Sequence, residues 1–115
     1  MHSIPDYYMA CDFSPYDISY KGEIVVNIPN NITSIGEEAF YKCTNLMSIT
    51  IPNSVVTIDR HAFSGCTSLN SVIIPDSVEH VGSGLFFGCT KLANVDIGSK
   101  LNSIGTTMFF NCIEL

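Results

Sequence analysis

The chain has 115 residues, of which 46% are hydrophobic and 14% are charged, and its 11 acidic and 5 basic residues give a formal net charge of −6. This composition fits one folded domain and excludes intrinsic disorder and a charged coiled coil. The acidic excess argues against nucleic acid and anionic membrane as main partners, because both require a basic surface; solubility alone accounts for the acidity. No apolar run reaches the roughly 18 residues of a membrane-spanning helix.

Residues 1–22 do not follow the pattern found in the rest of the chain. They are rich in aromatic residues and contain Pro5 and Pro15. Because the terminal units of repeat proteins are atypical, we expect an N-terminal capping segment here; a tyrosine-rich recognition patch is the alternative. Residues 1–10 contain Asp6 but no Lys or Arg, unlike a signal peptide. Either the protein is not exported by that route or a leader has been removed, so the sequence leaves the compartment unknown.

Residues 23–115 repeat with a period of 23 residues. The stretch CTNLMSITIP at Cys43 returns as CTSLNSVIIP at Cys66 and as CTKLANVDIG at Cys89, and a further copy opens at Cys112. A fixed period in the twenties is typical of a solenoid, in which equivalent coils stack on one another. We therefore predict three full copies and a partial C-terminal one within residues 23–115.

Each copy contains signals for two short extended segments. Residues 46–51 alternate toward their end and contain β-branched residues, which predicts a short strand. Pro52 ends this strand because it has no N–H for pairing, and residues 55–58 are predicted to be extended or a second short strand. Since all coils run in the same direction, strands of successive coils must pair in parallel.

A bend and a short helical turn complete the predicted coil. Glycine occupies one position in three of the four copies, and we expect a bend with an unusual backbone there. Its members are Gly36, Asp59, Gly82 and Gly105. Residues 37–43, which follow, are long enough only for one or two turns of α or 3₁₀ helix.

Apolar residues recur at equivalent positions, and we call each such set a column. Stacking these columns would build a continuous core. The two clearest columns are Phe40, Phe63, Phe86 and Phe109, and Leu46, Leu69, Leu92 and Leu115. Counting back by 23 residues places Glu23 in the leucine column, which predicts a degenerate first copy.

Four of the five cysteines also form a column. They are Cys43, Cys66, Cys89 and Cys112, while Cys11 lies outside the repeat. Side chains in register point the same way and do not face one another, so we expect reduced, packed thiols. Disulfides and metal binding are the alternatives, although a linear column does not converge on a zinc ion. We expect Cys11 to be an exposed thiol.

The repeat resembles the BspA-type leucine-rich repeat family. The pattern is L-x-x-I/V-x-I-P followed by V-x-x-I-G-x-x-A-F-x-x-C, which residues 51–69 match as IPNSVVTIDRHAFSGCTSL. The departures are Asp59 for the glycine, Leu85 and Met108 for the alanine, and Gly98 for the proline. The resemblance implies a leucine-rich repeat solenoid of the α/β type, a right-handed superhelix with a parallel β-sheet of short strands joined by short 3₁₀ or α turns.

The same resemblance implies a role. Members are found on the surfaces of bacteria and of some parasitic protists and are associated with adhesion to host proteins and other cells. A cell-surface or secreted location is therefore implied for this chain. The sequence shows no cluster of acid, base or nucleophile at irregular positions, so we predict no enzymatic activity, no cofactor and no metal site.

A candidate interaction surface follows from strand alternation. If Ile49 and Ile51 point inward, the residues between them point outward and form two rows across the sheet. The rows contain Val25, Asn27, Ser48, Thr50, Ser71, Ile73, Asn94 and Asp96. Such faces commonly bind protein partners; the alternative is that these are ordinary soluble strand residues.

Three functional hypotheses follow. The first is a non-enzymatic protein-interaction module that binds host or neighbouring-cell proteins through this strand face. The second is a structural stacking fragment of a longer repeat protein, with self-association through its open C-terminal end. The third is an intracellular scaffold.

Overall fold

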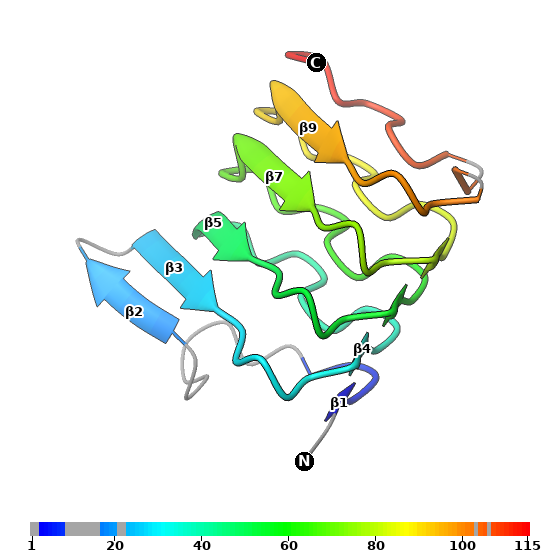
Figure 1. Ribbon diagram of the computed structural model, residues 1–115. Coiled ribbons are helices and arrows are strands. Elements are labelled where there is room, and N and C mark those ends of the chain that lie inside the picture. The colour runs from blue at the N-terminus through cyan, green and yellow to red at the C-terminus, as the bar shows by residue number, and fades with distance from the viewer. Residues whose placement is uncertain (1–2, 9–16, 21–22, 103, 106) are drawn as a thin grey trace.

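The computed structural model describes residues 3–8, 17–20, 23–102, 104–105 and 107–115. The chain winds into a solenoid of stacked coils, with the N-terminus at one end of the stack and the C-terminus at the other (Figure 1). This confirms the predicted repeat solenoid and its parallel pairing between coils.

One side of the solenoid carries the longer strands, which lie one above another (Figure 1). They are β2 (Asp17–Tyr20), β3 (Glu23–Asn27), β5 (Leu46–Thr50), β7 (Ser71–Ile74) and β9 (Asn94–Ile97). β3 pairs with β5 and β7 pairs with β9 in parallel, while β2 pairs with β3 antiparallel. β5 and β7 are neighbours along the stack but belong to different sheets. The strand face is therefore divided between its second and third coils.

A second side carries two-residue strands. They are β1 (Ser3–Ile4), β4 (Ser34–Ile35), β6 (Thr57–Ile58) and β8 (His80–Val81), and they pair in parallel in that order. β6 lies within the segment predicted to be extended. β1 pairs Ile4 with Ile35, so the N-terminal segment adds a strand to the stack although it lacks the 23-residue spacing.

The third side consists of turns, and the predicted helical turn at residues 37–43 is wrong: the described residues contain no helix. Alternate N–H groups donate in two directions. Those of Ala39 and Tyr41 donate to the carbonyl three residues earlier, while those of Phe40 and Lys42 donate to Ala62 and Ser64 of the next coil. A helix would need all these donors within one coil, so stacking of the coils replaces it.

The unusual backbone is two residues beyond the predicted position. Left-handed φ angles occur in two columns within the turns, and the glycine column that contains Gly36 has none among the described residues. The left-handed columns are Glu38, His61, Gly84 and Thr107, and Lys42, Gly65, Gly88 and Asn111. Gly36 is needed for a different reason: a Cβ there would lie 2.5 Å from the carbonyl carbon of Pro5. Close approach of two coils, not a left-handed φ, requires this glycine.

The apolar columns form one continuous core. Phe40, Phe63, Phe86 and Phe109 stack with ring centroids 5.6, 5.8 and 6.1 Å apart and nearly parallel planes. The stacked phenylalanine column predicted from the sequence is thereby confirmed. Phe63, in the middle of the stack, is fully buried.

The first copy is less degenerate than predicted. A register shift between β3 and β5 pairs Ile24, not Glu23, with Leu46, and the Ile24 side chain is buried. The shift places an extra residue on β5, as a β-bulge does. The bulge restores an apolar residue to the leucine column, which a count of 23 residues could not reveal.

The cysteine column only partly matches the prediction. Cys66, Cys89 and Cys112 are free thiols, and each Sγ donates a hydrogen bond of 3.1–3.2 Å to a phenylalanine carbonyl of the preceding coil. Cys43 is disulfide-bonded, so the expectation of a fully reduced column is wrong there. Cys11 lies outside the described residues.

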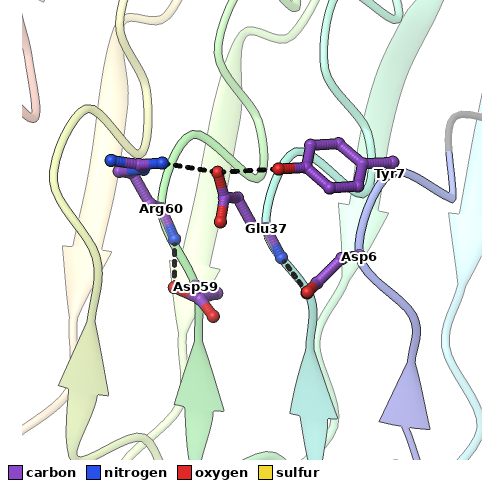
Figure 2. Close-up of polar contacts among 5 residues, drawn as sticks. All are labelled: Asp6, Tyr7, Glu37, Asp59 and Arg60. Atoms are coloured by element: carbon purple, nitrogen blue, oxygen red, sulfur yellow. Dashed lines mark hydrogen bonds and ion pairs between the residues drawn. The ribbon is translucent and has the colours of Figure 1, made fainter.

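The N-terminal end of the stack is held by a polar cluster (Figure 2). The Glu37 Oε2 accepts hydrogen bonds from Arg60 Nη2 at 2.6 Å and from the Tyr7 hydroxyl at 3.2 Å. The Glu37 N–H donates to Asp6 Oδ1 at 2.7 Å. The bond from Arg60 lowers the pKa of Glu37, and the bond to Glu37 raises the pKa of Tyr7. These contacts join the N-terminal segment to the next two coils; its role as a cap stays a prediction.

Candidate protein-interaction surface

The strand face, which we define as the outward residues of β3, β5, β7 and β9, contains all eight predicted site residues. Val25 and Ser48 are half-buried. The other six side chains are exposed: Asn27, Thr50, Ser71, Ile73, Asn94 and Asp96. Pairing places Val25 beside Ser48, Asn27 beside Thr50, Ser71 beside Asn94 and Ile73 beside Asp96.

The interruption between β5 and β7 separates these residues into two groups. A hollow of about 230 Å³ lies there, which we call the interstrand hollow. Its outer walls are Ser48, Thr50, Ser71 and Ile73, and the buried side chains of Ile49, Ile51 and Val72 also line it. We attribute the interruption to the bulge in β5, because a bulge bends its strand and increases the local twist. The strand face is therefore not flat and offers apolar side chains between two polar rims.

A second depression, which we call the corner groove, lies where the strands end. It has a volume of about 660 Å³, spans successive coils and shares Thr50, Ile51 and Ile73 with the interstrand hollow. Sequence reasoning missed several of its residues because they follow the strands and do not alternate. These residues are Asn53, Pro75, Asp76 and Gly98.

The departure at Gly98 has a structural reason. A Cβ at Gly98 would lie 2.5 Å from the Pro75 carbonyl oxygen, so the fourth coil turns tightly against the third at this corner. The recurring proline position after each strand was the available signal for the groove, since every member of that column terminates a strand. Replacement of proline by glycine marks a close approach of two coils at this corner.

The corner groove is acidic. Among the residues that the structure describes, Asp76 and Asp96 line it and no Lys, Arg or His does. Asp76 Oδ1 accepts a 2.9 Å hydrogen bond from the Ser99 N–H, and this bond, with a smaller contribution from Lys100, lowers the pKa of Asp76. The Asp96 carboxylate makes no hydrogen bond or ion pair with any residue in the described part of the chain. Of the two carboxylates, Asp96 is the one whose charge is uncompensated.

The buried free cysteines among the described residues are held in their neutral form. Burial raises the pKa of the Cys66 thiol and raises that of Cys89 to about 12, so both thiols stay protonated within the core. Within the ranges that the structure describes, no group of three or more His, Cys, Asp or Glu side chains could hold a metal ion. The same residues form no helix long and apolar enough to cross a membrane. The strand face, with its hollow and groove, offers contacts for binding.

Comparison with known proteins identifies similar chains. A family model, described as the BspA type Leucine rich repeat region, matches residues 20–115 in six copies. No curated protein sequence is significantly similar to the chain.

Solved structures with the same fold come from bacteria. The chain is similar to the leucine-rich repeat protein TpLRR of T. pallidum, with 34% identity, a TM-score of 0.77 and coverage of 79% of this chain and 42% of that one. It is similar to a leucine-rich repeat protein of Eubacterium ventriosum, with 28% identity, a TM-score of 0.77 and coverage of 84% and 26%. A leucine-rich repeat protein of Bacteroides ovatus has 25% identity, a TM-score of 0.54 and coverage of 89% and 37%. The chain thus spans less than half the length of each of these relatives.

Proposed function

This chain belongs to the BspA-type leucine-rich repeat family, and we propose that it is a non-enzymatic protein-interaction module that binds through the strand face. The observation that carries the proposal is Ile73, whose side chain is 65% exposed on a paired strand. It stands among small polar residues, with Thr50 and Ser71 nearby in the wall of the interstrand hollow. An apolar contact surrounded by polar groups is typical of protein interfaces.

The partner class we propose is a protein on a host or neighbouring cell. The family resemblance supports an adhesin-like role, and the acidic net charge of −6 disfavours nucleic acid. The disulfide at Cys43 also supports an oxidising compartment, where disulfides persist. An adhesin works outside the cell, so the disulfide and the proposed partner point to the same environment.

A binding screen against extracellular-matrix and cell-surface proteins tests the proposal. Any partner found should be lost by the triple variant S71K/I73K/N94K, because three lysines would cover the strand face. The matched control V56K/H80K/N102K adds the same charge at exposed positions away from that face and should bind normally. Equal binding by both variants would remove the strand face from the proposal.

The second candidate function is self-association through the C-terminal end of the stack. Phe110, Ile113 and Leu115 are 53%, 74% and 52% exposed there. The N–H groups of Phe40, Phe63 and Phe86 each donate to the following coil, whereas that of Phe109 has no acceptor among the described residues. An apolar end with free donors favours association with a second copy of the chain.

Sedimentation at increasing protein concentration tests the second candidate. Self-association through this end predicts that the apparent molecular mass rises with protein concentration. The variant I113K/L115K should abolish this rise, whereas the strand-face variant S71K/I73K/N94K should still show it. A chain that is monomeric at every concentration would reject the candidate.

A further inference from the structure

The corner groove and the interstrand hollow are continuous, because both are lined by Thr50, Ile51 and Ile73. The groove reaches from Ile28 in the first coil to Ile97 in the fourth. Three coil spacings of roughly 4.8 Å amount to about 14 Å, which an extended peptide of about four residues would span. Together the corner groove and the interstrand hollow form one depression, which has the length of a short extended segment lying along the stack.

The two parts of the depression differ in chemistry. The interstrand hollow has an apolar interior, where Ile49 and Val72 are 6% and 3% exposed. A volume of about 230 Å³ is enough for one aliphatic side chain but small for a whole peptide. Above it along the stack, Asp96 lies beside Ile73, and its carboxylate has no partner among the residues described. An apolar position is thus followed by an anionic one.

The spacing of these two positions sets the pattern of a ligand. The hollow lies between the second and third coils and Asp96 lies on the fourth, one and a half coil spacings or about 7 Å away. In an extended chain, side chains two residues apart point the same way and are separated by about 6.6 Å. A peptide along the stack would therefore present to both positions residues separated by one intervening residue.

From this geometry we propose that the depression binds an extended protein segment containing an aliphatic residue and, two residues away, a lysine or arginine. The aliphatic side chain occupies the interstrand hollow, and the cation pairs with Asp96 at the rim of the corner groove, where Asp76 adds negative charge. Charge complementarity selects this occupant, since no basic residue within the described ranges lines the corner groove or the interstrand hollow. The inference rests on the proposed function, of which it names the partner's chemistry.

Titration of the isotopically labelled protein with synthetic peptides, followed by amide NMR shifts, tests the inference. The probes are the capped pentapeptides Thr-Val-Thr-Lys-Thr and Thr-Lys-Thr-Val-Thr, which cover both chain directions. At least one should give saturable shifts at Thr50, Ile73 and Asp96. Replacing its Lys with Glu, or placing Val and Lys next to each other, should weaken binding by at least the roughly two- to fivefold expected for loss of one partly exposed ion pair.

Protein variants assign the two contacts. Asp96→Asn should weaken binding about two- to fivefold, as expected for one partly exposed ion pair. Glu79→Gln, an exposed acid away from the depression, should leave binding unchanged. Ser48→Phe should fill the wall of the hollow and remove the contribution of Val, while the circular dichroism spectrum checks that the variant folds.

Four results would overturn the inference. Equal binding of the Lys and Glu peptides would reject a basic ligand, and shifts confined to other faces would reject the site. If the peptides fail while a protein partner is lost in S71K/I73K/N94K, the peptide chemistry is wrong and the interaction function stands. If no protein partner depends on the strand face and no peptide binds, both proposals fail.

Discussion

The two ends of the solenoid show how strongly burial depends on the neighbouring coil. The column formed by β1, β4, β6 and β8 begins with Ile4, which is 1% exposed, and its equivalent in the last coil, Ile104, is 53% exposed. Phe40 at the first end is buried and contacts Tyr8 edge-on at 6.1 Å. Phe109 at the other end is only partly buried.

This difference shows that residue type alone does not decide whether a repeat position belongs to the core. An isoleucine at this position loses its contact with water only where neighbouring segments cover its side chain, so each coil is stabilised mainly by its neighbours. The same substitution should therefore have a large effect in the interior and a small one at the C-terminal end.

The largest effect is expected for the phenylalanine column. Phe63→Ala should lower the free energy of unfolding by about 3–5 kcal/mol, because it leaves a cavity between two stacked rings. Phe109→Ala should cost less than half of this, since that ring has one stacked neighbour. Urea denaturation followed by circular dichroism measures both. Equal costs would show that the last coil is as tightly packed as the interior.

The next comparison uses the two isoleucines that end one column. Ile4→Ala should cost about 2–4 kcal/mol, whereas Ile104→Ala should cost under about 1 kcal/mol because its side chain is already half in water. The same urea experiment tests whether the N-terminal segment caps the stack. A negligible cost at Ile4 would contradict the proposed cap.

Two glycines separate tight packing between coils from backbone strain. A Cβ at Gly82 would overlap the Arg60 backbone N and lie 2.5 Å from its Cα, so Gly82→Ala should cost about 1–3 kcal/mol by overpacking. Gly88 has a φ of +73° but nothing within 4 Å of an added Cβ. Gly88→Ala should cost only about 1 kcal/mol, from the left-handed conformation. If thermal denaturation shows the larger loss for Gly88→Ala, close approach of the coils is not the dominant constraint.

The smallest effect concerns the free thiols. Iodoacetamide should label the half-buried Cys112 faster than the buried Cys66 and Cys89, as mass spectrometry of the digested protein would show. Burial raises the pKa of Cys89 from 9.0 to about 12. The neutral, buried thiol of Cys89 therefore contributes its full stabilisation of the fold below pH 9. This contribution is lost as the pH rises from 9 to about 12, because the thiol ionises first in the unfolded chain. Equal labelling rates would contradict the buried column.

Much of the fold was predictable because a 23-residue period demands equivalent coils. The parallel pairing, the stacked phenylalanines and the outward orientation of Thr50 and Ile73 all follow from periodicity and strand alternation. The bulge that admits Ile24 to the core did not follow, since it depends on one residue of slippage between two strands. The disulfide at Cys43 likewise depends on which chain segments meet in space.

The sequence by itself determined the repeat, the columns and the face on which polar residues alternate, because these depend only on spacing along the chain. The tertiary structure decided where the strand face divides, which carboxylate stays without a partner, and which end of each column is exposed. These features depend on the fit of one coil against the next. Contacts of that kind join residues about 23 positions apart, so no single repeat contains the information that sets them.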